Sequence, residues 1–269
     1  MNWRPIAGIV LRQFYLMRSS PARILPLFAW VAIDIVLWGF MARYLNTVSN
    51  PNRALDFVAQ LLGAVLFWDF FIRVMQGVTI AFFEDVWSRN FLNLFATPLT
   101  IMQYITGLVI TSMATSAVGL LAMLILSTLA FGFALAVPGL FGVAFVLVLF
   151  LFGTALGIFA CALVLRMGPA SEWLIWPIPA LLSPFAGVFY PLSVLPPWMQ
   201  HFSRILPPAY VFEDLRSLLA GHPIQPQTAW LALLLAGAQV VLALWVFARV
   251  HRNAVRSGLL ARYSAEGVS

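Results

Sequence analysis

The sequence PIPALLSPFAGVFYPLSVLPPWMQHFSRILPPAYVFEDLR, from Pro177 to Arg216, decides how the rest of the chain is organised. An apolar run ends at Pro191, and two Leu-Pro-Pro steps follow it. Because proline has no amide donor and fixes φ, each step ends a helix and turns the chain. The segment is too broken to cross a bilayer and too apolar for a solvated loop. We therefore expect a pair of short re-entrant or interfacial helices, about residues 191–220, that covers one face of a transmembrane bundle.

The composition places the chain in a membrane. Hydrophobic residues make up 62% and charged residues 9% of the sequence, and the mean hydropathy is +0.96. These values exclude a soluble globular domain, in which about a quarter of the residues are charged. Long unbroken apolar runs exclude an outer-membrane barrel, whose strands alternate. We expect an all-α polytopic membrane protein with six transmembrane helices and no soluble domain, because 269 residues hold about six spans of roughly 20 residues.

The apolar runs divide the chain into three parts. Residues 1–23 carry arginines among apolar residues at helical spacing, which predicts an interfacial helix on the cytoplasmic surface. A transmembrane domain is expected over 24–250, and a cytoplasmic tail over 251–269. The expected spans are about 24–44, 57–83, 101–129, 140–165, 173–190 and 228–247.

The basic residues indicate both orientation and chemistry. All 15 are arginine, so the chain lacks the lysine of a Walker A phosphate-binding loop. With six spans, ten arginines fall on the side of the two termini and four on the other. The positive-inside rule then places both termini in the cytoplasm and the proline-rich element on the outer face. Membrane-surface arginines also explain the pI near 10.2 without nucleic-acid binding.

Two segments resemble one family. The segment 84–100, EDVWSRNFLNLFATPLT, has an acidic pair, an arginine, two leucines and a Thr-Pro-Leu end. This pattern resembles the first cytoplasmic loop of type-2 ABC exporter permeases, which contains the coupling helix. The proline-rich segment is similar to the distal part of the same permeases in the order and spacing of its motifs. The matching positions there are Gly187, Phe189, Tyr190, Pro191, Leu195, Pro196, Trp198, Leu206, Pro207, Tyr210, Glu213 and Arg216.

The resemblance implies a permease subunit of an ATP-driven exporter in the bacterial cytoplasmic (inner) membrane. Its substrate would be amphipathic, such as a lipid-linked glycan, a lipid or a hydrophobic drug. Two copies, or one copy and a related permease, would form the pathway. The chain would be no enzyme and bind no cofactor, because ATP and Mg would be held by separate ATPase subunits.

The resemblance also assigns residues to roles. The implied ATPase-coupling residues are Glu84, Asp85, Arg89, Leu92, Leu94, Phe95 and Pro98. The implied outer gate consists of Pro191, Pro196, Trp198, Pro207, Tyr210, Glu213 and Arg216. The alternative for segment 84–100 is an amphipathic helix that only rests on lipid headgroups.

Three charged residues fall within the expected spans, namely Asp34, Asp69 and Arg73. Intramembrane charges are costly and are candidates for function, for example in proton coupling. Asp69 and Arg73 lie four residues apart, so they share a helix face and can pair. We favour a structural interpretation, with this pair near the cytoplasmic end and Asp34 bonded inside the bundle or facing a cavity.

Two other functions are weaker. A membrane enzyme could use His201, Glu213 and Asp214 as acid–base groups at the outer surface, but no nucleophile or metal motif accompanies them. The three histidines also lack the spacing of a metal site. An ion-driven secondary transporter is disfavoured because the sequence shows no inverted repeat.

Overall fold

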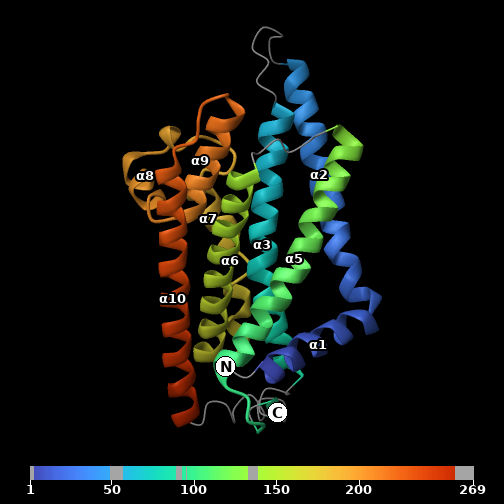
Figure 1. Cartoon of the computed structure of the whole chain (residues 1–269), viewed down its shortest axis with the longest axis vertical. Coiled ribbons are helices and arrows are strands. Elements are labelled where there is room, and N and C mark those ends of the chain that lie inside the picture. The colour runs from blue at the N-terminus through green and yellow to red at the C-terminus, as the bar shows by residue number, and fades with distance from the viewer. Residues whose placement is uncertain (1–2, 49–56, 89–92, 95, 133–138, 258–269) are drawn as a thin grey trace.

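The chain folds into a bundle of long helices (Figure 1). The computed structural model describes residues 3–48, 57–88, 93–94, 96–132 and 139–257, and its regular elements over these residues are all helical. The long helices are α1 (Trp3–Ser19), α2 (Pro21–Val48), α3 (Phe57–Trp87), α5 (Ile101–Phe131), α6 (Gly139–Met167) and α10 (Pro226–Arg256). All of these except α1 are long and apolar enough to span a membrane, which gives five such helices in the described part of the chain.

Local sequence explains where the helices begin and end. The break between α1 and α2 falls at Pro21, as the sequence predicts. Thr100 caps α5 in a reciprocal capping box with Gln103, which satisfies backbone amides at the start of the helix. Gly132 ends α5 at φ 67°, a left-handed conformation that glycine adopts without strain.

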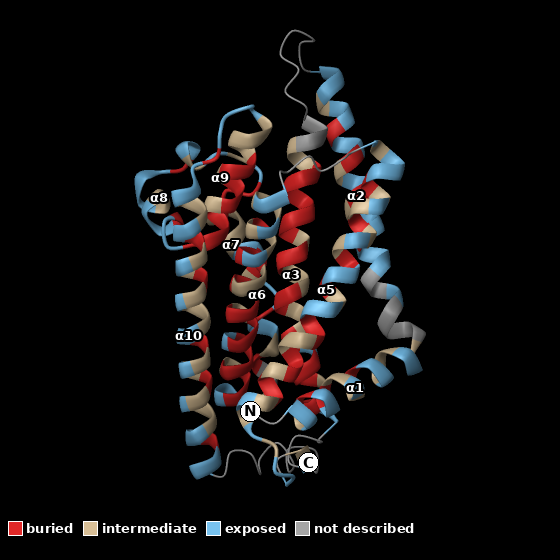
Figure 2. Ribbon diagram, in the orientation of Figure 1, coloured by how far each residue is buried: buried red, intermediate tan, exposed pale blue. Residues whose placement is uncertain are grey.

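The core forms around α3 and α6, whose buried residues run down the centre of the bundle in Figure 2. Near the lower end of Figure 1, one buried cluster includes Phe82 and Phe247. Near the upper end, another includes Phe67 and Phe212. In the 18-residue apolar stretches with which α2 and α10 could span a membrane, only 22% of the residues are buried. Their exposed apolar faces suit contact with lipid hydrocarbon or with a second membrane subunit.

Two glycines let α3 and α6 approach closely. A Cβ on Gly153 would lie 3.0 Å from the carbonyl oxygen of Phe71, and one on Gly157 would lie 3.0 Å from that of Met75. Small residues at this spacing allow backbone contact between membrane helices. Gly153 and Gly157 therefore allow α6 to pack closely against α3.

The expected span 173–190 is not a continuous helix. Instead, a 3₁₀ helix, η1 (Pro169–Leu174), precedes the nine-residue α7 (Ile178–Ala186). At 1.5 Å per residue, α7 is about 14 Å long, less than half of a hydrocarbon core of about 30 Å. The break has a sequence cause, because Pro177 stands before α7, Pro184 lies inside it, and Gly187 ends it at φ 61°.

The broken segment nevertheless connects the two ends of the bundle. Ile175 packs in the lower buried cluster, and Ala186 packs in the upper one. The proline-rich element follows at the upper end of Figure 1 as η2 (Leu192–Val194), α8 (Pro197–Ser203) and α9 (Pro207–Leu219). Its helices begin at the two Leu-Pro-Pro steps, as the sequence predicts.

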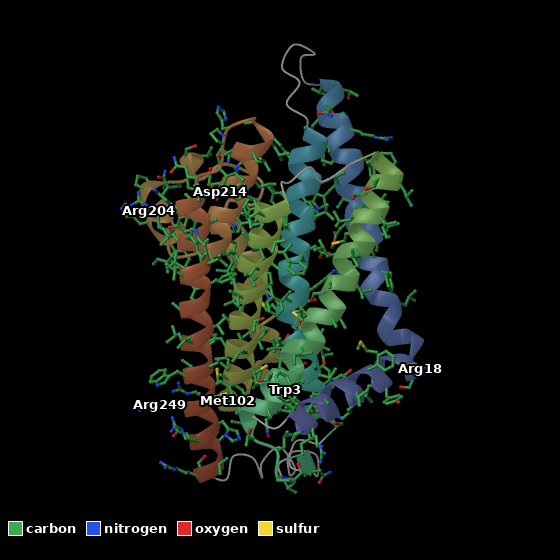
Figure 3. The ribbon with its side chains drawn as sticks, in the orientation of Figure 1. Trp3, Arg18, Met102, Arg204, Asp214 and Arg249 are labelled. Carbon is green, nitrogen blue, oxygen red and sulfur yellow. The ribbon has the colours of Figure 1, made fainter. Side chains whose placement is uncertain are left out.

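The arginines separate towards the two ends of the bundle. Figure 3 shows Arg204 at the upper end, with Arg18 and Arg249 at the lower end. Helix α1 and the last turns of α10 share that lower end (Figure 1). The assignment of these two ends to opposite membrane faces stays a prediction.

Candidate functional site: a polar cavity and its latch

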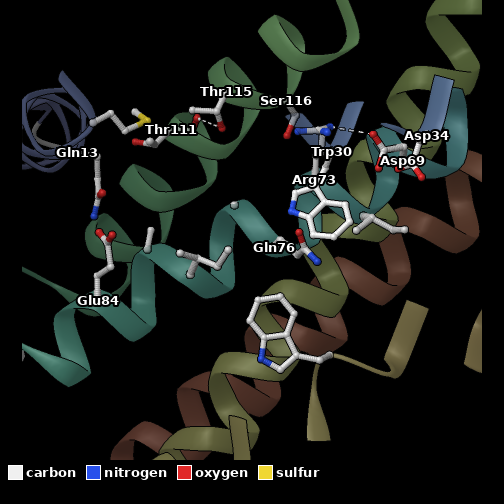
Figure 4. A pocket seen from close by; sticks show the side chains of 16 residues that line it. Gln13, Trp30, Asp34, Asp69, Arg73, Gln76, Glu84, Thr111, Thr115 and Ser116 are labelled. Atoms are coloured by element: carbon white, nitrogen blue, oxygen red, sulfur yellow. Dashed lines mark hydrogen bonds and ion pairs between the residues drawn. The ribbon is translucent and has the colours of Figure 1, made fainter. Parts of the chain in front are cut away.

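A cavity of about 600 Å³ lies between α1, α2, α3 and α5 (Figure 4). One face of α3 forms its longest wall, because the lining residues recur at intervals of three and four. The stretch from Asp69 to Glu84 corresponds to about 22 Å of helix. Main lining positions on α3 are Asp69, Arg73, Gln76, Gly77, Ile80 and Glu84.

The three intramembrane charges meet in this cavity. Arg73 Nε donates to Asp69 Oδ2 at 3.0 Å, with side chains 10% and 14% exposed. This confirms the pairing expected from their four-residue spacing. Asp34 on α2 also lines the cavity and lies beside Asp69 in Figure 4. The pair lies near the middle of α3 rather than near the cytoplasmic end, and Asp34 faces the cavity.

Two polar side chains that the sequence analysis did not single out complete the wall. Gln13 on α1 is 4% exposed and Ser116 on α5 is 1% exposed. Within the described residues, neither Gln13 Nε2 nor Ser116 Oγ has a hydrogen-bond partner. Figure 4 shows Gln13 directed toward Glu84, and Ser116 near Arg73. The sequence alone does not identify these two residues, because each lies in an apolar run. They meet around one cavity only through the packing of α1 and α5.

A buried ion pair fastens α1 to the lower end of α3. Arg12 pairs with Asp85, whose side chain is fully buried, and Tyr104 Oη donates to Asp85 Oδ2 at 2.7 Å. The hydrogen bond to Asp85 holds the pKa of Arg12 above its ordinary value, so the guanidinium stays charged. We call Arg12, Asp85 and Tyr104 the α1 latch. It places Asp85, an expected ATPase-coupling residue, inside the fold.

The rest of the expected coupling segment is divided between core and surface. Glu84 lines the cavity, Leu94 is half-buried against the lower cluster, and Pro98 is exposed. Trp87 Nε1 donates to Glu172 Oε2 at 3.0 Å, which joins this segment to η1. The expected coupling residues Arg89, Leu92 and Phe95 lie outside the described residues.

At the upper end, Glu213 and Arg216 join α9 to the end of α7. Glu213 Oε1 accepts from the Leu192 amide at 2.7 Å and from Arg216 at 3.0 Å. Arg216 also donates to the Gly187 carbonyl at 2.7 Å. These expected gate residues therefore hold the chain reversal after α7, which lacks helical hydrogen bonds of its own.

The other expected gate residues shape the same element. Tyr210 Oη donates to the Arg204 carbonyl at 2.9 Å. Pro191 stands before η2 in extended backbone, Pro196 stands before α8, and Pro207 is the first residue of α9. Trp198 is 66% exposed, and its ring packs edge-on against Phe185.

The structure gives no support to the acid–base alternative. His201 Nδ1 lies 2.6 Å from the Pro197 carbonyl oxygen, within its own helix. Asp214 accepts from Thr228 at 2.7 Å, and burial raises the pKa of Asp214. In the described ranges, no three His, Cys, Asp or Glu side chains are grouped to hold a metal ion.

Comparison with known proteins gives one family. A family model described as ABC-2 type transporter matches residues 9–220. The matched part includes most of α1, the cavity, the latch and the proline-rich element. A comparison with curated proteins finds no match.

Proposed function

Because the chain belongs to the ABC-2 type transporter family, we propose that it is the permease subunit of an ATP-driven exporter. The match to residues 9–220 is the observation that carries this proposal. The chain contains no lysine, so the Walker A lysine and the ATP with its Mg²⁺ belong to a partner ATPase subunit. The proposed substrate is amphipathic, such as a lipid-linked glycan, a lipid or a hydrophobic drug.

The proposed topology has six crossings, with η1 and α7 together as the fifth. Support comes from Ile175 and Ala186, which pack in the clusters at opposite ends of the bundle. Both termini would face the cytoplasm of a bacterium across its inner membrane, since ten arginines lie on their side of this topology. The element α8–α9 would then act as an outer gate held by Glu213 and Arg216.

Segment 84–100 is the proposed docking surface for the ATPase subunit. Its position is favourable, because its first residues form the end of α3 and motion of the segment reaches the cavity wall through this one helix. The α1 latch would carry the same motion into α1, since Asp85 belongs to α3 and Arg12 to α1. The bond from Trp87 to Glu172 would link η1 to the docking surface, so that η1 forms a second contact with the ATPase subunit. A second copy, or a related permease, would complete the pathway.

The docking proposal is tested by co-purification of the co-expressed ATPase subunit with tagged permease variants. Leu94 is a poor probe, because it packs against the protein's own core. Ala96 is exposed in the same segment, and Ala220 is exposed at the opposite end of the bundle. We expect Ala96→Arg to lose the ATPase subunit, because a long cation would occupy the docking surface, and Ala220→Arg to retain it. Full retention by Ala96→Arg would reject this docking surface.

Topology is tested by reporter fusions in the two connections. A fusion at Gly221 should report the outer side, and fusions after Ser88 or at the end of α10 should report the cytoplasm. A cytoplasmic signal at Gly221 would show that η1 and α7 do not complete a crossing.

A further inference from the structure

The walls of the cavity carry more acidic than basic groups. Three lining residues have carboxyl side chains, Asp34, Asp69 and Glu84, and one, Arg73, has a guanidinium. The Asp69 carboxylate is already paired with Arg73. Asp34 makes no ion pair or hydrogen bond of its own within the described residues, but Arg73 is close enough to attract its charge, so one guanidinium serves two carboxyl groups. Asp34 also lies in a stretch that can span a membrane. A carboxyl group at such a depth is costly unless a counter-charge or water reaches it.

Two nearly inaccessible polar atoms also face this space without partners. They are Gln13 Nε2 and Ser116 Oγ, on side chains 4% and 1% exposed. Buried polar atoms in folded proteins almost always have a hydrogen-bond partner. Both residues line the cavity from different helices, so a change of side-chain rotamer would bring either atom to a bound molecule.

The remaining walls suit an apolar and aromatic ligand. Trp30 and Trp176 line the cavity together with Ile72 and Met17. Indole rings attract organic cations through their π faces, and the Trp30 and Trp176 side chains are accessible to a ligand, at 63% and 46% exposed. The volume of about 600 Å³ is that of a site for a drug-sized molecule. Aromatic walls beside an unpaired carboxyl group are the chemistry that recognises an organic ammonium ion.

We propose that this cavity binds an amphipathic amine or quaternary ammonium compound, with Asp34 as the counter-ion for its cationic group. This inference rests on the proposed export function and names the substrate class of that site. Trp30 and Trp176 would hold the apolar part, and Gln13 and Ser116 would bind its polar substituents. Arg73 beside Asp34 is already paired with Asp69, so these three groups keep an excess of negative charge that a cationic ligand would neutralise.

The test is a binding measurement on the purified full-length permease in dodecyl maltoside. Two probes carry the same nitrobenzoxadiazole label and the same dodecyl chain, and they differ only in an amine or a hydroxyl group. Fluorescence anisotropy should show tighter binding of the amine. Asp34→Asn should weaken amine binding by at least about tenfold, which is about 1.4 kcal/mol, and leave the alcohol unchanged. Equal binding of both probes by the wild type, or unchanged amine binding by Asp34→Asn, would overturn the proposal.

Two further variants control for folding and location. Asp214→Asn makes the same substitution in α9, where the new side chain can still accept the Thr228 hydrogen bond, and it should bind the amine like the wild type. Ser116→Phe should fill the cavity and weaken both probes. Loss of amine binding in Asp214→Asn as large as that in Asp34→Asn would remove the claim for this cavity.

The amine could come from a lipid headgroup or from a soluble molecule. Reconstitution into vesicles of phosphatidylethanolamine or of phosphatidylglycerol alone separates these sources. Weaker probe binding in phosphatidylethanolamine supports a lipid amine, and equal binding supports a soluble one. The assay needs no ATPase subunit, so its failure would leave the co-purification result for Ala96→Arg standing.

Discussion

Breaking the ion pair of the α1 latch should destabilise the protein more than removing the hydrogen bond that Tyr104 donates to the same latch. Arg12→Gln leaves Asp85 fully buried, with the Tyr104 hydroxyl as its remaining side-chain partner among the described residues. Removing one partner of a buried ion pair costs about 3–5 kcal/mol. The Arg12 side chain is 26% exposed, so solvent already screens part of the pair and we expect the lower limit, about 3 kcal/mol. Tyr104→Phe removes one hydrogen bond to a charged group and should cost about 1.5 kcal/mol.

The chain contains its own reporter for this measurement. Cys161 is the only cysteine and is fully buried, so a thiol-reactive fluorogenic dye labels it only when the core opens. Melting curves with this dye should rank Arg12→Gln as the least stable, Tyr104→Phe as intermediate and the wild type as the most stable. Arg12→Gln combined with Asp85→Asn should recover stability, because no buried charge is then unpaired. A double variant no more stable than Arg12→Gln alone would refute the reasoning. So would a loss of stability in Tyr104→Phe as large as the loss in Arg12→Gln.

Three further predictions are checked by melting curves, the first two with the same dye and the third by circular dichroism, because a thiol hardly reacts at pH 4. Asp69→Asn should lose up to about 3 kcal/mol and regain part of it when Arg73→Gln is added, and no recovery would argue against direct pairing. Gly157→Leu should cost about 1–3 kcal/mol through overpacking, since even a Cβ there would lie 2.9 Å from Val78 Cβ, and an unchanged melting curve would show that α3 and α6 can separate freely. The pKa of Asp214 is raised by burial from an ordinary value of 3.8, so its contribution to stability is full below that pH and is lost as pH rises through the raised pKa. Asp214→Asn should therefore be more stable relative to wild type at pH 7 than at pH 4, and the opposite trend would contradict the raised pKa.

The sequence was sufficient for the long helices because each follows from hydropathy and a local boundary signal. Pro21 separates α1 from α2, and the Leu-Pro-Pro steps begin α8 and α9. The prediction was wrong at 173–190, where mean hydropathy predicts one continuous helix and individual residues prevent it. Pro177 and Pro184 interrupt the helical hydrogen bonds, an effect that average hydropathy does not register.

The site was predictable only where its residues are neighbours in sequence. Asp69 and Arg73 share one turn of helix, so spacing alone predicts their pair. Asp34 meets them because of how α2 packs on α3, which no local pattern specifies. The bond between Arg12 and Asp85 joins residues 73 positions apart, and local spacing predicts neither it nor the burial of Asp85.

The break between η1 and α7 affects how the chain enters the membrane during synthesis. A continuous helix satisfies its own backbone and can partition into lipid by itself, whereas a segment interrupted at Pro177 and Gly187 leaves carbonyl and amide groups that lipid cannot satisfy. On the proposed topology, this segment can leave the translocon only when neighbours are present to cover it. The bonds from Glu213 and Arg216 to the backbone at 187–192 come from α9, which is made later. The fifth crossing would therefore be completed after translation of the residues that follow it, and ribosomes paused before α9 should hold it uninserted.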